Sequence, residues 1–467
     1  MNQAASARST AHGLYAAIVA NLLFPLHERL KGHDTVQALR ELEKSQWLSP
    51  VELRELQLRR LRGLLEHAAR HVPYYRGLFG RLRFSASSVS SLRDLERIPF
   101  LTKDIVRTHL DDLKAEDAQD LRLFSTTGSS GDPLRFYIGK RRVSRDVAAK
   151  WRATRWLGVE LGERELVFWS SPIEVSAQDS VRAWRDRLLR TRLRASANVS
   201  PARLDEFIAE ILAFRPAMIF GYPSVIDLVC QRAEDRAIDL RVAGTRAIFA
   251  TAERLYPQQR ERMQRVFGCT VANGYGGRDA GFIAHECAAG GMHITSEDLI
   301  VEIVDENGRQ LGPGEPGQVA VTHLFTAEFP FIRYLNGDVA VLSAATCGCG
   351  RGLPLLEDIR GRTNDFIVAA DGRLVHDVAF AVLLRDMPGV KMFKIIQHEI
   401  NRLELLLVTT ADFDSRGAPD RIRALFVQRL DPAIELTIRH VDDIPPEPTG
   451  KYRYVISKVP RPSGRYT

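Results

Sequence analysis

The residues best suited to chemistry form a short loop at positions 125–133, whose sequence is STTGSSGDP. Its glycines let backbone N–H groups close around an anion, and its hydroxyls can donate hydrogen bonds to phosphate oxygens. It is not a Walker loop, because Asp132 and Pro133 follow Gly131 where that motif has a lysine and a hydroxyl. A plain surface turn is the alternative interpretation. The expected nucleotide-phosphate contacts are Ser125, Thr126, Thr127, Gly128, Ser129, Ser130 and Gly131.

Further motifs follow this loop along the chain: NGYGGRD at 273–279, RYLNGD at 333–338, GRTND at 361–365 and PTGK at 448–451. In this order and spacing they resemble the core motifs of the acyl-adenylate-forming enzymes. That superfamily comprises acyl-CoA synthetases, peptide-synthetase adenylation domains and luciferases. The resemblance covers residues from about 65 to 455.

Other segments narrow the resemblance to one branch of the superfamily. They are LRRLRGLLEHAARHVPYYRGLF at 58–79, GYPS at 221–224, HEC at 285–287 and CGCGR at 347–351. These segments resemble the phenylacetate-CoA ligase and capsule-biosynthesis adenylyltransferase branch. The resemblance implies that ATP activates a carboxylic acid to an acyl-adenylate with release of pyrophosphate, and that the acyl group then passes to a thiol such as coenzyme A.

Two alternatives stay open from the residues alone. The acceptor could instead be an amine or a carrier protein in capsule or natural-product biosynthesis, or the chain could be a non-catalytic nucleotide-binding relative. Intact Lys451, Asp338 and Arg362 argue against the non-catalytic alternative. The acid substrate cannot be read from the sequence, because folding brings the pocket residues together.

The activation step needs a cation, because an anionic carboxylate must approach an anionic α-phosphate. Lys451 stands where the family has its catalytic lysine, although a lysine after a turn can also be an ordinary surface residue. Asp338 matches the residue that binds the ribose hydroxyls, since a carboxylate offers two acceptor oxygens to a diol. The resemblance further assigns Arg362 to ribose or phosphate contact and Asp365 to a hinge about which a C-terminal domain rotates.

The NGYGGRD motif departs from the family at Asp279, where relatives usually have a glutamate that helps to hold Mg²⁺. Aspartate keeps the charge with one methylene less, so we expect Asp279 to retain this role. Tyr275 is expected beside the adenine or the acyl pocket, or else as a buried aromatic residue. Glu253 follows Ala252 where relatives commonly have Gly-Glu. The expected nucleotide-binding set also includes Glu253, Asn273, Gly274, Tyr275 and Gly276. The expected acyl-pocket residues, which could equally be core, are Tyr222, Pro223, Ala250 and Gly276.

Cysteines and a histidine suggest a metal site. His285, Cys287, Cys347 and Cys349 offer one imidazole and three thiols, which suffice for a structural tetrahedral Zn²⁺ site. Some relatives in this branch carry such a zinc. His293 and Cys269 are substitute ligands if His285 points away, and buried free cysteines are the alternative.

Composition is that of a multidomain globular protein. The chain has 467 residues, of which 45% are hydrophobic and 26% charged, with a formal net charge of +7. The arginine-rich segments at 140–142 and 182–194 are interpreted as solvated helix faces, and no pattern indicates nucleic acid as a partner. Five cysteines are too few for a disulfide framework, which favours a cytoplasmic location.

The apolar run at residues 13–25 is too short for a membrane span and lacks a signal-peptide cleavage site. We expect an amphipathic capping helix there, with docking on a membrane surface as the second option.

Alternating helical and strand patterns predict an α/β fold. We expect a large N-terminal domain of layered α/β subdomains plus a β-rich subdomain, followed by a small mobile α+β C-terminal domain. The expected bounds are 1–360 for the first domain, with a helical entry layer at 1–120, an α/β core at 121–298 and a β-rich subdomain at 299–360; 361–366 for the hinge; and 367–467 for the C-terminal domain.

Overall fold

A computed structural model describes most of the chain. The described residues are 13–125, 134–169, 185–196, 200–362, 366–371, 374–376, 380, 384, 387–445 and 454–459. The chain divides into two compact units. Unit 1 comprises Met1–Glu302, Ala320–Asn336 and Ser343–Glu357, and unit 2 comprises Ile303–Val319, Gly337–Leu342 and Asp358–Thr467. Two segments expected in the β-rich subdomain, Ile303–Val319 and Gly337–Leu342, therefore group with the C-terminal residues.

Unit 1 begins with helices whose ends are specified locally. In α4 (Pro50–His71), Ser49 accepts a hydrogen bond from the Glu52 N–H while Glu52 bonds back to Ser49, and Pro50 occupies the first turn. The helix stops before Pro73, which begins α5. The other helices of this region are α2 (Phe24–Leu30), preceded by a π-helical turn η1 (Val19–Leu23), α3 (Thr35–Ser45), α5 (Pro73–Leu82), η2 (Ala86–Ser88), η3 (Leu92–Arg97) and α6 (Lys103–Thr108).

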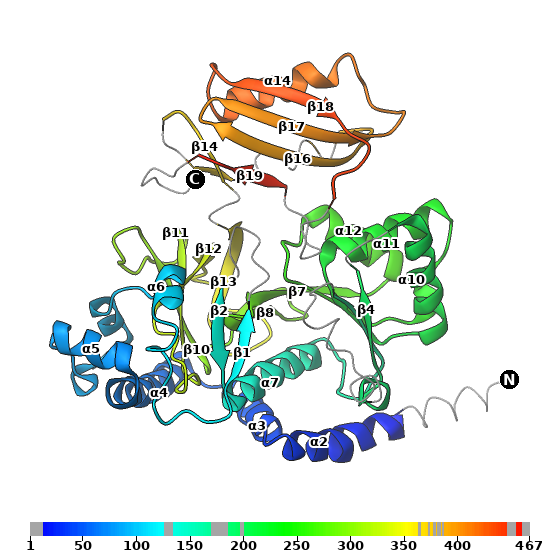
Figure 1. Ribbon diagram of the computed structural model, residues 1–467. Coiled ribbons are helices and arrows are strands. Elements are labelled where there is room, and N and C mark those ends of the chain that lie inside the picture. The colour runs from blue at the N-terminus through cyan, green and yellow to red at the C-terminus, as the bar shows by residue number, and fades with distance from the viewer. Residues whose placement is uncertain are drawn as a thin grey trace. The chain divides into compact units, whose positions relative to one another are not determined.

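The largest sheet among the described residues has eleven strands, in the order β10-β11-β12-β13-β9-β8-β7-β6-β5-β3-β4 (Figure 1). Strands β4, β3, β5, β6 and β7 are parallel, and β8 and β9 continue the sheet antiparallel. The strands are β3 (Glu165–Trp169), β4 (Thr191–Ala195), β5 (Met218–Gly221), β6 (Ala247–Thr251), β7 (Thr270–Gly277), β8 (Gly281–Glu286), β9 (Met292–Ile294), β10 (Leu299–Val304), β11 (Pro316–His323), β12 (Tyr334–Leu342) and β13 (Leu355–Arg362). A separate hairpin pairs β1 (Arg122–Ser125) with β2 (Arg135–Ile138).

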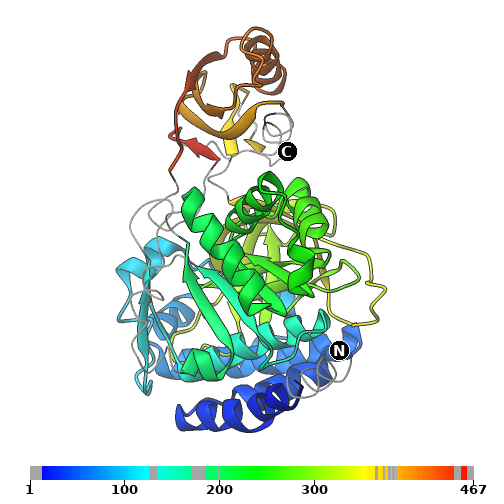
Figure 2. The same ribbon diagram turned by 90° about the vertical axis from the view of Figure 1, so that its right-hand side faces the viewer.

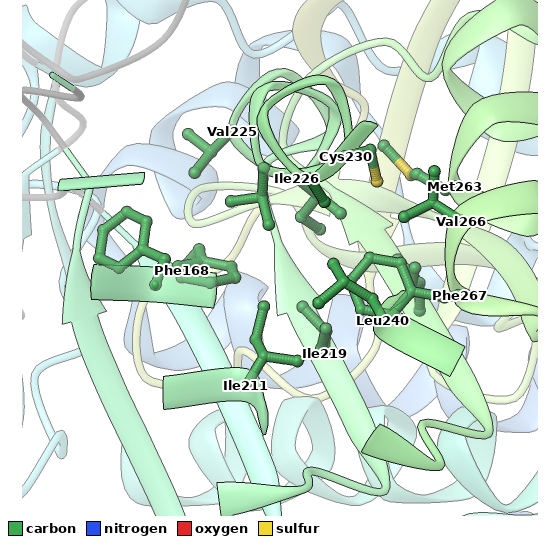
Figure 3. Close-up of a cluster of buried hydrophobic side chains, with 14 of the residues drawn as sticks. Phe168, Ile211, Ile219, Val225, Ile226, Cys230, Leu240, Met263, Val266 and Phe267 are labelled. Carbon is green, nitrogen blue, oxygen red and sulfur yellow. The ribbon is translucent and has the colours of Figure 1, made fainter. Parts of the chain in front are cut away.

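Helices cover both faces of the central parallel strands, and β5 and β6 are buried along their whole length. Ile219, Ile248 and Val271 are register partners that belong to the core beneath α10 (Pro201–Phe214), α11 (Pro223–Asp235) and α12 (Pro257–Phe267). Figure 3 shows part of this core, and Figure 2 shows these helices in front of the sheet. The next residue of each of the three strands points to the opposite face, where Ala153 of α7 (Lys140–Trp156) and Leu157, which follows that helix, pack. A short helical segment, η4 (Leu240–Ala243), closes the connection before β6.

Unit 2 contains a four-stranded sheet in the order β18-β17-β16-β19 (Figure 1). Its strands are β16 (Val390–Glu399), β17 (Arg402–Thr409), β18 (Glu435–His440) and β19 (Val455–Ser457), beside a small hairpin of β14 (Phe366–Val368) and β15 (Leu374–His376). Helix α14 (Ala418–Arg429) contributes Phe426, whose ring lies 4.5 Å from that of Phe380. Together the two units confirm the predicted α/β fold class.

Candidate functional site

The parallel strands β5, β6 and β7 carry the candidate site where they end. Tyr222 follows β5, Glu253 lies two residues beyond β6, and Tyr275 lies near the end of β7. Because the carboxyl ends of parallel strands meet at one edge of a sheet, this edge is where open α/β sheets bind ligands. The name carboxyl edge is used below for Tyr222, Pro223, Glu253, Tyr275 and Asp279.

Two hydrogen bonds join the NGYGGRD motif to the RYLNGD motif. The Tyr334 hydroxyl donates to Asp279 Oδ2 at 2.7 Å, and Asn336 Nδ2 donates to the Tyr275 hydroxyl at 2.9 Å. Tyr334 and Asn336 are two residues apart on β12, so their side chains share a face. Asp279 and Tyr275 are partly exposed. Segments about 60 residues apart in sequence are thus held together at the carboxyl edge.

Sequence analysis overlooked Tyr334 and Asn336, since only Asp338 of their motif carried an expected role. The available signal was their spacing of two on an apolar strand, which turns both polar groups to one side. Asp338 itself lies in β12 and is partly exposed, directly after Gly337, whose φ is 89°. Arg362 is the last residue of β13.

Two arginines hold the start of the loop at positions 125–133, which is called the Ser/Thr/Gly loop below. Arg278 Nη1 donates to the carbonyl oxygen of Ser125 at 3.0 Å, and Arg142 Nη2 donates to the Arg278 carbonyl at 2.8 Å. Thr126, Thr127, Gly128, Ser129, Ser130 and Gly131 lie outside the described residues, as do Lys451 and Asp365. The structure therefore shows how the entrance of the loop is held, and the roles of its remaining residues stay predictions.

The expectation that residues 140–142 form a solvated face is wrong for Arg142, which is fully buried. Its Nε lies 3.5 Å from Asp146, and His323 Nε2 lies 3.8 Å from the same carboxylate. Burial would raise the pKa of Asp146, but Arg142 and His323 favour the anion, and its pKa is lowered. Arg145 and Arg152 of α7 are also buried and pair with Asp298 and Glu297. Helical spacing aims these arginines inward at acids that the sequence places far away.

Glu253 acts within the carboxyl edge as a helix cap. Its Oε2 accepts a hydrogen bond from the Ser224 N–H at 3.2 Å, at the start of α11. The contact ties the end of β6 to the Tyr222–Pro223 turn. Ala252, just before it, has a φ of 69°, a backbone conformation that glycine adopts more readily than alanine.

Several expected ligand contacts also have packing roles. A Cβ at Gly274 would lie 2.2 Å from the Phe249 ring, and one at Gly276 would lie 2.4 Å from the Gly281 carbonyl oxygen. Tyr222 is 1% exposed, and its ring stacks on Trp169 with centroids 4.7 Å apart. Ala250 is fully buried in β6, Pro223 begins α11, and the Asn273 N–H donates to Glu286. The substrate and nucleotide contacts expected of these residues remain predictions.

A group of side chains that could hold a metal ion, called the cysteine cluster below, comprises Cys287, His293, Cys347 and Cys349. The Sγ atoms of Cys287 and Cys347 are 3.6 Å apart, and Cys349 Sγ lies 3.2 Å from His293 Nε2. With Zn–S bonds of about 2.3 Å, thiolates on a zinc tetrahedron lie about 3.7 Å apart, so this spacing fits the ion. The other ring nitrogen of His293 faces the Leu353 carbonyl oxygen, a common arrangement for a zinc-bound histidine.

The expected ligand His285 is replaced by His293. His285 sits opposite His293 in the β8–β9 pair, but its ring packs between Phe249 and Phe282, with centroids 5.9 and 5.2 Å away. Burial lowers the pKa of His285 to about 3, so the ring is neutral. Cys269, the other substitute, is not part of the group.

The amino-acid sequence of this chain is similar to those of known proteins. Residues 367–458 match the family model of the CapK C-terminal domain. Protein CapK of Staphylococcus aureus is 23% identical over 418 residues, covering 87% of this chain and 90% of that protein. The phenylacetate-coenzyme A ligase of Thermus thermophilus is 25% identical over 354 residues, covering 74% of this chain and 78% of that protein.

Solved structures show the same fold. The crystal structure of 2-hydroxyisobutyryl-CoA ligase in the postadenylation state, in complex with R3-HIB-AMP, has a TM-score of 0.73 at 21% identity. The match covers 88% of this chain and 91% of that one.

Among the described residues, no helix is long and apolar enough to cross a membrane.

Proposed function

We propose that this chain, which belongs to the acyl-adenylate-forming superfamily in the branch of CapK and the phenylacetate-CoA ligases, is an AMP-forming acid:thiol ligase. A carboxylate oxygen attacks the α-phosphorus of ATP, and the bond to pyrophosphate breaks. The thiol sulfur of coenzyme A then attacks the acyl carbon, its proton leaves, and AMP is released. The single observation that carries the proposal is the pair of hydrogen bonds that joins Tyr275 to Asn336 and Asp279 to Tyr334.

Those hydrogen bonds support a defined role for the carboxyl edge. The Tyr334 hydroxyl occupies one oxygen of Asp279, which fixes the direction of the carboxylate. A fixed carboxylate is suited to an Mg²⁺ ion, which neutralises phosphate charge when it is bound. Ser125 begins the proposed phosphate loop, and the Arg278 contact holds its carbonyl.

The remaining roles rest on the motif resemblance. Lys451 supplies the cation for adenylation, Asp338 receives the ribose hydroxyls, Arg362 contacts ribose or phosphate, and Asp365 is the hinge. A hinge is reasonable because two reactions with different nucleophiles share one phosphate site. We propose that the reaction takes place in the cytoplasm, because ATP and coenzyme A are available there.

Zinc is proposed as a structural ion of the cysteine cluster. Three thiolates and one imidazole complete four-coordination and leave no position for substrate. The ion would join the turn after β8 to the segment before β13. This role is separate from the chemistry of the carboxyl edge.

A second candidate differs only in the acceptor. The acceptor would be an amine or a carrier protein in place of coenzyme A, an alternative that the sequence leaves open. The C-terminal domain of this superfamily would then present a different nucleophile to the same acyl-adenylate.

A pyrophosphate-release screen tests the proposal. Purified protein is given ATP and Mg²⁺ with aromatic, fatty or amino acids, each with and without coenzyme A. We expect one acid class to release pyrophosphate and to form a thioester only when coenzyme A is present. Pyrophosphate release without a thioester would favour the second acceptor. A protein that binds ATP but releases no pyrophosphate with any acid would be a non-catalytic relative.

A further inference from the structure

A second group of metal-binding side chains lies at the surface of unit 1, outside the cysteine cluster. It consists of His67 and His71 of α4 and Asp117, which follows α6 in the chain (Figure 1). The histidines are four residues apart on a helix and therefore share one face. One ligand atom of each residue lies within 4.8 Å of the others.

The distances in this group fit a shared ion better than a hydrogen-bonded pair. His67 Nε2 lies 3.6 Å from Asp117 Oδ1, and His71 Nδ1 lies 3.5 Å from Asp117 Oδ2. Both exceed ordinary hydrogen-bond lengths of about 2.7–3.2 Å. Ligand atoms about 2.0–2.1 Å from a tetrahedral Zn²⁺ ion lie roughly 3.3–3.4 Å from one another, and the two histidine nitrogens lie slightly farther than this from separate oxygens of the Asp117 carboxylate. By contrast, His109 Nδ1 and Asp112 Oδ2 are 3.0 Å apart, which is an ordinary hydrogen-bond length.

The state of the His67 ring gives independent support. Its Nε2 is shielded from solvent and has no hydrogen-bond partner among the described residues. A shielded ring nitrogen without a partner loses the stabilisation that water would give it. The His67 and His71 rings stack with centroids 4.7 Å apart, which brings their nitrogens to the same side of Asp117.

The backbone already holds the group in place. The Glu116 N–H donates to the His71 carbonyl at 2.8 Å, and Glu116 pairs with Arg76 of α5 at 2.6 Å. We propose that His67, His71 and Asp117 bind a Zn²⁺ ion, with water in the fourth position. The ion would join the end of α4 to the segment that leads into β1 and the Ser/Thr/Gly loop.

Zinc stoichiometry tests this site on the full chain. Protein freed of metal by a chelator is titrated with Zn²⁺ in a calorimeter. Wild type should bind two ions, and the double variant His67→Gln/His71→Gln should bind one, which is a loss of one equivalent without change in the cysteine cluster. The control His109→Gln should still bind two ions.

A spectroscopic arm separates the two sites further. In a Cys347→Ser/Cys349→Ser background that folds, X-ray absorption should show nitrogen and oxygen ligands only. If this background does not fold, the comparison of wild type with the histidine variant is decisive alone. Equal zinc binding by wild type and His67→Gln/His71→Gln would overturn the proposal.

A different observation concerns the first helical segment, residues 13–30. Its outer face exposes a large aliphatic side chain at every fourth position, and these are Leu14 (66% exposed), Ile18 (40%), Leu22 (60%), Leu26 (52%) and Leu30 (80%). The opposite face is apolar too, because Val19 and Phe24 pack against Leu161. A continuous row of exposed aliphatic side chains on one helix face is suited to contact with a second surface.

The π-helical turn η1 keeps this outer row together. In an α-helix each residue turns by about 100°, so a row of fourth residues drifts by about 40° at every step. The wider π turn at Val19–Leu23 rotates less per residue. Leu22 therefore points more nearly in the direction of Ile18 than it would in a regular α-helix. The outer row is called the leucine row below. Figures 1 and 2 show α2 at one edge of unit 1, beside α3.

Charge identifies the surface that the leucine row fits. Within the helical segment 13–30 the only acidic residue is Glu28, which is buried and accepts a hydrogen bond from Thr35. Arg29 is exposed on the helix, and α3, which contacts α2, exposes Arg40 and Lys44, whereas its acids Glu41 and Glu43 pair with Arg145 and Arg155. Basic residues near an anionic leaflet strengthen membrane binding by electrostatic attraction. We propose that the leucine row docks on an anionic lipid surface.

Vesicle sedimentation of the full chain tests the docking. Wild type should pellet with phosphatidylcholine vesicles that contain phosphatidylglycerol, and much less with phosphatidylcholine alone or at high salt. Leu22→Gln/Leu26→Gln should reduce the pelleted fraction at least tenfold. Leu82→Gln/Val242→Gln, which changes exposed apolar residues elsewhere, should pellet as wild type does.

Light scattering tests whether a second copy of the chain, and not lipid, covers the leucine row. A dimer that Leu22→Gln/Leu26→Gln converts to a monomer would show that a second copy of the chain covers the row and would overturn the lipid proposal. Absence of sedimentation with anionic vesicles would also overturn it.

Discussion

The carboxyl edge and the cysteine cluster lie in the same unit but are held in place by different means. Tyr222, Glu253 and Tyr275 lie in or next to strands whose backbone pairing sets their positions. In the cysteine cluster only His293 lies on a strand, and the three cysteines come from turns and loops. The edge can therefore lose a side chain and keep its fold, whereas the cluster depends on the side chains themselves. Variants at the first should change chemistry, and variants at the second should change stability.

The largest effect should come from Lys451→Ala. Loss of the cation that screens the attacking carboxylate should slow adenylate formation by about a thousandfold. Thiolysis of a supplied acyl-adenylate should stay nearly intact, because that step needs no attack on phosphate. Pyrophosphate exchange into ATP measures the first step, and Lys458→Ala is the control. Normal exchange by Lys451→Ala would remove this lysine from the mechanism.

At the carboxyl edge, Asp279→Asn should reduce adenylation by about a hundredfold and raise the Mg²⁺ concentration needed for half-maximal rate. Tyr334→Phe, which removes the hydroxyl that donates to Asp279, should have a smaller effect of about tenfold. Melting temperatures should change little in both variants. An unchanged Mg²⁺ requirement in Asp279→Asn would show that the carboxylate has a structural role instead.

The cysteine cluster should behave in the opposite way. His293→Gln should lower zinc content and reduce the free energy of unfolding by several kcal/mol, because metal-binding energy contributes directly to folding. His285→Gln should keep the zinc, and so should Cys269→Ser. Metal analysis and thermal melts of the same preparations make the comparison. Loss of zinc in His285→Gln with retention in His293→Gln would restore the ligand set expected from the sequence.

The smallest effect should come from Ala252→Gly. Ala252 has a φ of 69°, a left-handed conformation that costs a residue with a Cβ roughly 1–2 kcal/mol. Glycine removes this cost but loses more entropy on folding, so the net stabilisation should be about 0.5–1 kcal/mol. Chemical denaturation measures it. Ala250→Gly, at a fully buried strand position, should destabilise, and a similar loss from both variants would contradict the backbone argument.

Local patterns predicted many elements well. The periodicity of residues 257–267 predicts a helix, which is α12, and the β-rich run at 247–250 predicts a strand, which is β6; the pattern of residues 402–440 likewise predicts the strand–helix–strand order of β17, α14 and β18. Such segments carry their own signals: apolar periodicity, proline at a helix start and glycine after its end. Both ends of α12 are marked in this way by Pro257 and Gly268.

Burial of charge was not predictable in the same manner. The arginines of α7 look like a solvated face, since arginine is usually exposed. Arg145 and Arg152 are instead buried against Asp298 and Glu297, roughly 150 positions away. Only tertiary packing brings such partners together, so the residues next to each arginine in the sequence do not indicate which acid it will pair with.

By itself, the sequence determined the motifs, their order and the α/β fold, because these depend on residue types and on local periodicity. The tertiary structure alone decided which of two histidines belongs with the cysteines. His285 and His293 face one another across the β8–β9 pair, and both are near cysteines in the chain. Packing of His285 between Phe249 and Phe282 leaves His293 to meet Cys349, and this choice depends on side chains from other strands.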